Sequence, residues 1–119
     1  MAEQIDVNTP QWLDADGRLM VGRDPTNGRL FYPPRPYAPR TLATAELVAV
    51  SGRGTIYTYS IVRRAPPETA VVAFVKLEEG PTMLTNIVDC DPDSVRIGQA
   101  VTMLVRERNG APAPVFAPA

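Results

Sequence analysis

The stretch AELVAVSGRGTIYTYSIV, residues 45–62, decides the fold class of this chain. Two runs rich in apolar, β-branched and aromatic residues flank a glycine-containing turn at 51–54, which is typical of two successive β-strands. Further runs of the same kind, each bounded by Pro, Gly or Asp, follow at residues 70–77, 82–88 and 100–108. The chain is therefore predicted to be mainly β.

One short helical element interrupts this series of strands. In DPDSVRIG, Asp91 is placed as a helix cap, Pro92 as the first helical residue and Gly98 as the terminator. Sandwiches usually need about seven strands or more, so five strands with one helical turn in residues 43–119 favour a small closed barrel. The five-stranded OB-fold is the leading architecture of this size.

The residues before the barrel predict two smaller elements. Asn8-Thr9-Pro10 is a helix start and Asp16-Gly17 its end, which makes residues 1–17 a lead-in with a short N-terminal helix. Residues 18–32 are predicted to form a hairpin, because Asn27-Gly28 tolerates the positive φ of a tight turn. The predicted organisation is a lead-in at 1–17, an arm at 18–42 and the barrel domain at 43–119.

Four prolines, Pro33, Pro34, Pro36 and Pro39, stiffen the end of the arm. Proline fixes φ and donates no N–H, so this segment is neither a central strand nor a helix interior. One interpretation is a plain spacer. The other is a rigid arm that presents Arg35, Tyr37 and Arg40 to a partner, and we expect a spacer that also makes contacts.

Composition excludes several classes of function. The chain has 119 residues, a net charge of −1 and no histidine, and its one cysteine is Cys90. Ser-His-Asp and Cys-His catalysis are thus excluded within the chain, and an independent enzyme with its own catalytic residues is not expected. The near-zero charge argues against a nucleic-acid binder. With neither a membrane-length apolar run nor a signal-like N-terminus, we expect a cytoplasmic protein without membrane attachment.

The segments SGRGTIYTYSIVRR, KLEEGPTMLTNIVDCDPDSVRIGQAV and PVFAPA carry a more specific resemblance. Over roughly residues 12–119 the chain resembles the zinc-ribbon/OB-fold acyl-CoA-associated family, also called domain of unknown function thirty-five. The resemblance implies an N-terminal helix, a rubredoxin-like ribbon and a C-terminal OB-fold.

The family's ribbon pattern departs from this chain at its metal ligands. Arg23, Gly28 and the Pro33-Pro34-Arg35 segment match, but the four cysteine positions fall on Asp24, Asn27, Ala38 and Thr41. A structural zinc site needs four N or S ligands, so we predict a degenerate, metal-free ribbon. Its outline would then be kept because Phe31, Tyr32 and the prolines pack against another surface.

The resemblance also implies a function. Family members are non-catalytic companions of thiolase-like enzymes in acyl-CoA thiolysis, condensation or retro-aldol cleavage, often as heterotetramers with two copies of each subunit. The companion scaffolds the catalytic subunit and contributes to an acyl-CoA channel. For this chain the resemblance implies a thiolase-like partner, a coenzyme A thioester as the substrate of the complex, and no catalytic residue or cofactor of its own.

Two sets of residues are candidates for contacts. Arg63 and Arg64 end a predicted strand and are candidates for the phosphates of coenzyme A, although a solvated strand end is the favoured interpretation. Tyr57 and Tyr59 lie two apart on one predicted strand and so should share a face, used either for core packing or for recognition. The candidate partner-interface residues are Phe31, Tyr32, Arg35, Tyr37, Tyr57 and Tyr59.

Two alternative functions remain open at this level. OB-folds commonly bind single-stranded nucleic acid through exposed aromatic side chains, which predicts salt-sensitive binding of oligonucleotides. A stand-alone acyl-CoA-binding protein is the second alternative, and it predicts tight binding of acyl-CoA without a second subunit.

Overall fold

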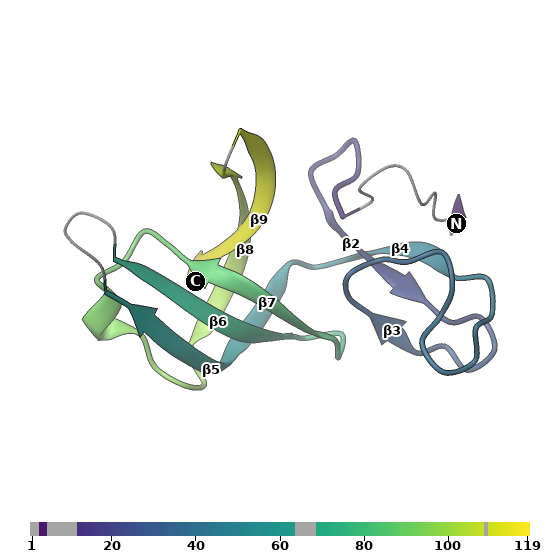
Figure 1. The fold of residues 1–119 in the computed structure, drawn as a ribbon, viewed down its shortest axis with the longest axis horizontal. Helices are drawn as coiled ribbons and strands as arrows, with labels where there is room; N and C mark the ends of the chain where they lie inside the picture. Colours follow the sequence, from purple (N-terminus) through teal and green to yellow (C-terminus); the bar gives the residue numbers. More distant parts are fainter. Residues whose placement is uncertain (1–2, 5–11, 64–68, 109) are drawn as a thin grey trace. The chain divides into compact units, whose positions relative to one another are not determined.

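The computed structural model describes residues 3–4, 12–63, 69–108 and 110–119, and Figure 1 shows strands joined by loops in these parts. The strands divide into two compact units. The knuckle unit comprises Met1–Gly52 with Glu79–Pro81, and the barrel unit comprises Arg53–Glu78 with Thr82–Ala119. In the described residues no helix is long and apolar enough to cross a membrane.

The knuckle unit contains a four-stranded sheet in the order β1-β4-β2-β3, with all neighbours antiparallel. The predicted hairpin of residues 18–32 is confirmed, because β2 and β3 pair through Gly22 with Phe31 and Arg23 with Leu30. The buried Ala45 and Leu47 form a small core against which Met20 and Phe31 pack. The strand bounds are β1 Glu3–Gln4, β2 Leu19–Arg23, β3 Leu30–Phe31 and β4 Glu46–Val50.

Strand β4 corrects the predicted domain boundary. Residues 43–52 were expected to begin the barrel, but β4 pairs along its whole length with β2. The compact knuckle unit therefore extends to Gly52. Composition cannot distinguish these assignments, since an apolar strand next to a turn suits either sheet, and only the partner strand decides its place.

The barrel unit is a closed five-stranded barrel in the order β5-β6-β7-β9-β8 (Figure 1). Its neighbours are antiparallel except β7 and β9, which are parallel through Ile87 and Phe116. A 3₁₀ turn, η1 (Pro92–Ser94), lies between β7 and β8. This is the predicted OB-fold. The strand bounds are β5 Arg53–Val62, β6 Ala70–Leu77, β7 Thr82–Ile87, β8 Ala100–Arg108 and β9 Ala111–Pro118.

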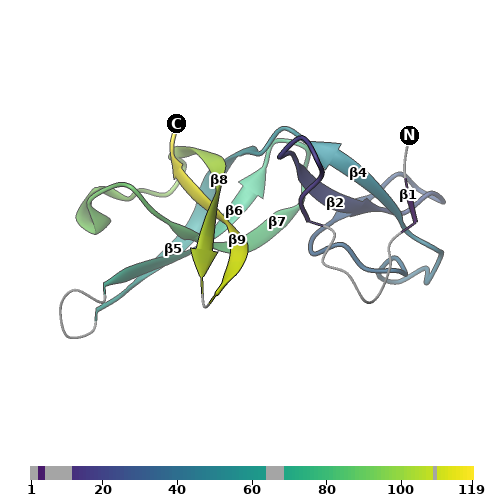
Figure 2. The same ribbon diagram turned by 90° about the horizontal axis from the view of Figure 1, so that it is seen from above.

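The fifth barrel strand was not expected. Strand β9 is the Pro/Ala-rich segment after residue 110, which Figure 2 shows running beside β8. Phe116 directs its carbonyl toward β7, where it accepts the N–H of Val88 at 2.8 Å. Because backbone groups alternate sides along a strand, the even-numbered Pro112, Pro114 and Pro118 also place their nitrogens on the β7 side. The ladder to β8 is therefore left intact, and the prolines are tolerated.

The helical element between β7 and β8 begins as predicted, but it ends at Ser94 with Val95 as its C-cap and does not extend to Gly98. The Asp91 side chain accepts the N–H of Asp93 at 3.0 Å, and Pro92 is the first residue of η1. Val95 directly follows η1 and is buried at 3% exposure. The short turn thus delivers an apolar side chain into the barrel unit.

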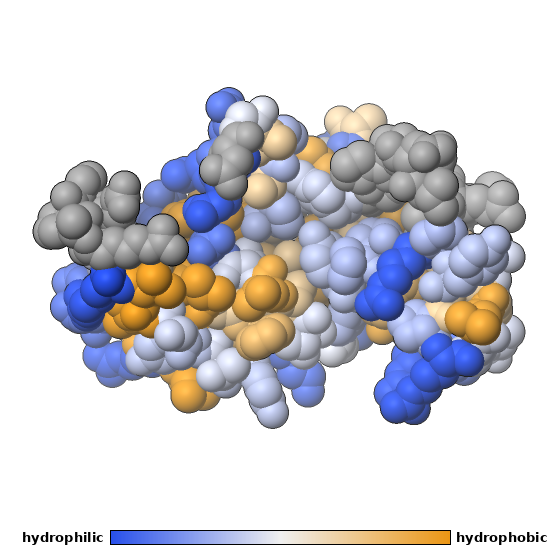
Figure 3. Space-filling model, viewed as in Figure 1, coloured by the Kyte–Doolittle hydropathy of each residue, from blue (hydrophilic) through white to orange (hydrophobic). Residues whose placement is uncertain are grey.

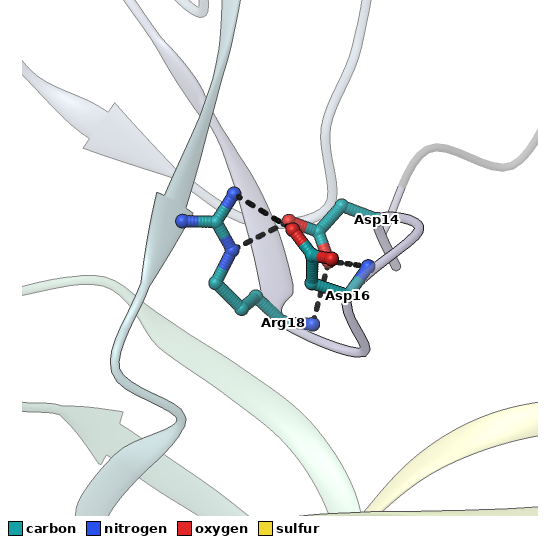
Figure 4. A network of polar contacts seen from close by, with 3 residues as sticks. All are labelled: Asp14, Asp16 and Arg18. Atoms are coloured by element: carbon teal, nitrogen blue, oxygen red, sulfur yellow. Dashed lines mark hydrogen bonds and ion pairs between the residues drawn. The ribbon is translucent and has the colours of Figure 1, made fainter.

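The predicted N-terminal helix is replaced by a turn wherever the structure describes it. Its proposed start at Asn8-Thr9-Pro10 lies outside the described residues. Farther on, Leu13 bridges Leu19, and Figure 4 shows the Asp14 carboxylate holding the turn between them. That carboxylate accepts the N–H groups of Asp16 and Arg18 at 3.0 and 2.7 Å, and Arg18 Nε at 2.6 Å. These hydrogen bonds, the Arg18 N–H first, lower the pKa of Asp14.

Candidate functional site

Two loops of the knuckle unit have the same backbone hydrogen bonds. In the first knuckle, residues 24–29, Gly28 N–H donates to the Asp24 carbonyl at 2.7 Å, and Asp24 N–H donates to the Arg29 carbonyl at 2.8 Å. In the second, residues 38–43, Leu42 N–H donates to the Ala38 carbonyl at 3.0 Å, and Ala38 N–H donates to the Ala43 carbonyl at 2.8 Å. The fifth residue of each knuckle, Gly28 or Leu42, has positive φ, at 74° and 59°.

A buried carboxylate joins the two knuckles. Asp24 is 2% exposed, and its Oδ1 accepts the backbone N–H and the hydroxyl of Thr26 at 2.9 and 2.6 Å. Its Oδ2 accepts the hydroxyl of Thr41 in the second knuckle at 2.7 Å. These hydrogen bonds favour the charged form, the Thr26 hydroxyl first, and they lower the pKa of Asp24.

The residues at the four ligand positions do not fit a structural zinc ion. Both Asp24 oxygens are occupied by hydrogen bonds within the unit, and Ala38 has no donor atom and is fully buried. Asn27 Oδ1 accepts the N–H of Arg29 at 2.9 Å, and the Thr41 hydroxyl is bound to Asp24. A tetrahedral site of thiolate and imidazole ligands cannot be assembled from this set.

The aromatic residues of the arm pack mostly within the knuckle unit. Phe31 lies against the core residues Ala45 and Leu47, and its ring occupies the space where a side chain at Gly22 would be. The guanidinium of Arg35 lies 5.9 Å from the centroid of the Phe31 ring, within the range of a cation–π contact. Phe31 thus packs within the knuckle unit with Arg35 over its ring, and their assignment to a partner interface stays a prediction.

The two tyrosines of the arm differ in exposure. Tyr32 is half-buried, and burial raises its pKa to about 12. Tyr37 is 59% exposed, and Leu42 of the second knuckle is 73% exposed. Tyr37 and Leu42 are thus the exposed apolar side chains of this part of the knuckle unit, and sequence reasoning did not single out Leu42.

Tyr57 and Tyr59 do not share a face, contrary to the prediction. The β5–β6 register shifts between Ile56 and Thr58, so Tyr57 is the extra residue of a β-bulge and is 65% exposed. Tyr59 lies opposite the buried Ala73 and therefore takes the inner side of the sheet. A bulge reverses the alternation that the two-residue spacing assumed.

The outer face of β5, β6 and β7 carries an apolar patch that sequence reasoning missed. Phe74 and Leu84 lie directly opposite each other on neighbouring strands and are 44% and 58% exposed. Figure 3 shows apolar side chains gathered over the β5–β6 part of the barrel unit. We call Tyr57, Val72, Phe74 and Leu84 the barrel patch. Along β6, Phe74 lies between the buried Ala73 and Val75, so the two-residue period of a strand could have placed Phe74 on the outer face.

Of the two candidate coenzyme A residues, the structure describes Arg63. Arg63 donates through Nη2 to the Asp93 carboxylate of η1, and both side chains are largely exposed. Arg64 lies outside the described residues. Elsewhere in the barrel unit, a hollow of about 400 Å³ is lined by β5, β6 and β8, with Lys76 and Arg53 at its border. Arg53 there forms an ion pair with Glu78 at 2.9 Å.

The fold and the knuckles define a class of protein, an OB-fold barrel that follows a ribbon-like unit. In agreement with this, residues 47–106 match the family model for the C-terminal OB-fold domain of ChsH2. A solved chain described as "Ltp2-ChsH2(DUF35) aldolase" is 33% identical with a TM-score of 0.73, covering 85% of this chain and 84% of that one. The chain belongs to the DUF35 family.

Two curated relatives extend the comparison. A "DUF35 domain-containing scaffold protein" of Methanothermobacter thermautotrophicus is 40% identical over 87 residues, which are 67% of this chain and 65% of that protein. A "Probable enoyl-CoA hydratase alpha subunit" of Thermomonospora curvata is 35% identical over 117 residues, which are 91% of this chain and 36% of that protein. This chain thus spans just under two thirds of the scaffold protein and about a third of the hydratase subunit.

Proposed function

We propose that this chain is a non-catalytic accessory subunit of a thiolase-like acyl-CoA enzyme. The observation that carries the proposal is the likeness, at 33% identity and a TM-score of 0.73, to the DUF35 chain of an aldolase whose name joins Ltp2 with ChsH2. The scaffold-protein name of one relative and the enoyl-CoA hydratase name of another support the same role. Thiolysis, condensation and retro-aldol cleavage all remain within this proposal.

The side chains of the chain support an accessory role. It has no histidine, the commonest general base, so proton transfer in the complex is assigned to the catalytic subunit. Its single cysteine, Cys90, has no histidine in the chain that could serve as its base. In this proposal the chain supplies a docking surface that positions the catalytic subunit.

The barrel patch is the surface that we assign to the catalytic subunit. Tyr57, Phe74 and Leu84 expose large apolar side chains on one unit, and aromatic and large aliphatic groups are the usual anchors of protein interfaces. Tyr37 and Leu42 of the knuckle unit are a second candidate contact. Two copies of each subunit are the expected assembly.

The coenzyme A thioester enters this proposal as the substrate of the whole complex. Arg63 is a candidate for a phosphate contact, for which it must exchange its Asp93 partner. Such an exchange is chemically reasonable, because an exposed ion pair contributes little and a phosphate accepts two guanidinium hydrogen bonds. Arg64 is the second candidate.

Co-expression with the catalytic subunit tests the proposal. The full chain carries an affinity tag, and the purified complex is examined by mass spectrometry and by light scattering. We expect a thiolase-like subunit in equal amount and acyl-CoA activity only in the complex. Turnover of an acyl thioester by the chain alone would contradict the accessory role, as would the absence of an acyl-CoA enzyme from the purified material.

A pair of variants locates the docking surface. Phe74→Asp with Leu84→Asp places two charges in the barrel patch and should reduce recovery of the partner at least tenfold. Val105→Asp is the matched control, because Val105 is 40% exposed on β8, outside the patch. Equal loss in both variants, or none in the first, would remove the patch from the proposal.

A further inference from the structure

We propose that the knuckle pair is a metal-site backbone in which the Asp24 carboxylate takes the structural place of the metal ion. The proposal has two parts. The native unit holds its knuckles together without metal, and the same backbone still accepts a zinc site when four cysteines are put at positions 24, 27, 38 and 41. It is independent of the proposed accessory function.

The two loops are equivalent in their backbone hydrogen bonds. Each knuckle closes with an N–H donated from its fifth residue to the carbonyl of its first, and with an N–H donated from its first residue to the carbonyl of its sixth. Positions 24 and 38 are thus equivalent, and so are 27 and 41. Two Cys-x-x-Cys loops facing each other are the usual source of four thiolates for one zinc ion.

The two loops also lie close together. The Asp24 and Thr41 oxygens lie 2.7 Å apart although they belong to different knuckles. In a tetrahedral site with Zn–S bonds of about 2.3 Å, two sulfur atoms lie about 3.8 Å apart. The loops are therefore already close enough for side chains at positions 24 and 41 to share one ion.

The side chains at positions 24, 27, 38 and 41 all make contacts within the knuckle unit. Asp24 and Thr41 bond to each other, Ala38 fills its corner with a buried methyl group, and Asn27 caps its own loop through the Arg29 N–H. Each position has a contact within the unit that does not involve an ion. Arg29 and Arg40 line the adjoining hollow of about 170 Å³ together with Asp24, and the charge of Arg23 adds to the hydrogen bonds that lower the pKa of the carboxyl group.

The test compares the native chain with a fourfold variant, Asp24→Cys, Asn27→Cys, Ala38→Cys and Thr41→Cys, kept reduced. Zinc content is measured after dialysis, and unfolding of the knuckle unit is followed by the fluorescence of Trp12, the single tryptophan. We expect less than 0.1 zinc per native chain and no effect of a chelator on its melting temperature. The variant should bind about one zinc per chain and lose at least 10 °C in melting temperature when the chelator removes it.

Conservative variants test the carboxylate link without relying on the fourfold change. Thr41→Val removes the hydroxyl bound to Asp24, and we expect the melting temperature to fall by about 4–8 °C. Thr44→Val, at an exposed threonine near by, is the matched control and should change it by less than 2 °C. Equal effects of these two substitutions would overturn the link.

The remaining outcomes also decide the proposal. Stoichiometric, tightly held zinc in the native chain would overturn its first part. A fourfold variant that folds without taking up zinc, or that fails to fold with zinc present, would overturn the second part, because the backbone would then not be that of a metal site.

Discussion

The two units of this molecule are held together by different means. The barrel unit closes on itself through five paired strands around buried side chains such as Val75, Val115 and Phe116. The knuckle unit has a small sheet with two-residue strands at its edges, and its loops depend on the carboxylates of Asp14 and Asp24. The barrel is thus stabilised mainly by apolar burial, whereas the knuckle unit adds to its smaller apolar core the polar contacts of two carboxylates, which depend on pH.

The largest expected effect is on closure of the barrel. Phe116 is fully buried and is the residue through which β9 pairs with β7, so Phe116→Ala should lower the free energy of unfolding by about 3–5 kcal/mol. Urea denaturation followed by circular dichroism measures the loss, with Phe74→Ala as an exposed control. If Trp12 fluorescence shifted by the same amount, the comparison would fail, because the two units would then unfold as one.

A smaller effect is expected when one glycine of each unit is replaced by alanine. A Cβ at Gly54 would lie 2.6 Å from the Lys76 carbonyl oxygen, which is backbone, whereas a Cβ at Gly22 would meet the Phe31 ring. We expect Gly54→Ala to cost about 3 kcal/mol, because the strand must move, and Gly22→Ala about 1 kcal/mol, because a ring end can turn aside. Chemical denaturation of both variants measures the difference, and the reverse order would contradict this account.

The dependence of stability on pH should be strongest in the knuckle unit. Burial raises the pKa of Tyr32 from 10.0 to about 12, so between these values the unfolded chain loses its proton and the folded chain keeps it. Stability is therefore complete below pH 10 and falls as the pH rises toward 12, by about 2 kcal/mol. Trp12 fluorescence against urea, measured from pH 8 to 12, should show this loss, and Tyr32→Phe should flatten it.

At acid pH, the stability of the knuckle unit should increase with rising pH, which is the opposite of its behaviour at alkaline pH. The pKa values of Asp14 and Asp24 are lowered from 3.8, so their contribution is present above pH 3.8 and is lost as the pH falls below it. The Trp12 signal should accordingly report unfolding of the knuckle unit during acid titration. A barrel that unfolds at the same acid pH as the knuckle unit would weaken the contrast between the two.

The smallest effect concerns one exposed side chain. Leu42 has φ of 59°, a conformation that costs a β-carbon-bearing residue energy but suits glycine. Leu42→Gly should raise the free energy of unfolding of the knuckle unit by up to about 1 kcal/mol, while Leu42→Ala, which keeps the Cβ, should not. Thermal melting of the two variants measures this, and a destabilised glycine variant would show that the leucine side chain contributes packing.

Much of the fold was predictable because its signals are local. The β-rich pattern, the hairpin of residues 18–32 and the Asp91-Pro92 turn all depend on residues adjacent in sequence, and all were found. The number of strands in the barrel was predicted correctly, but one of the five strands assigned to it was wrong. β4 belongs to the other sheet and β9 takes its place, and these assignments depend on pairing partners distant in the sequence.

The candidate site was predictable to a similar degree. The positions equivalent in the two knuckles were identified from the resemblance, but the hydrogen bond from Thr41 to Asp24, across seventeen residues, depends on how the loops face each other. Tyr57 and Tyr59 were placed on one face because a bulge has no clear signature in those residues. Phe74 was overlooked, although the alternation of side chains along a strand places it on the face opposite to Ala73 and Val75.

The prolines of β9 have a consequence for how the molecule behaves at high concentration. Beyond its single pair with β7, the strand places the nitrogens of Pro112 and Pro114 on the β7 side, where the Pro114 carbonyl accepts the Thr85 hydroxyl at 2.9 Å. A strand of another molecule that approached this side would find no N–H donors at the prolines. Edge-to-edge aggregation is therefore disfavoured where β9 has few hydrogen bonds to β7.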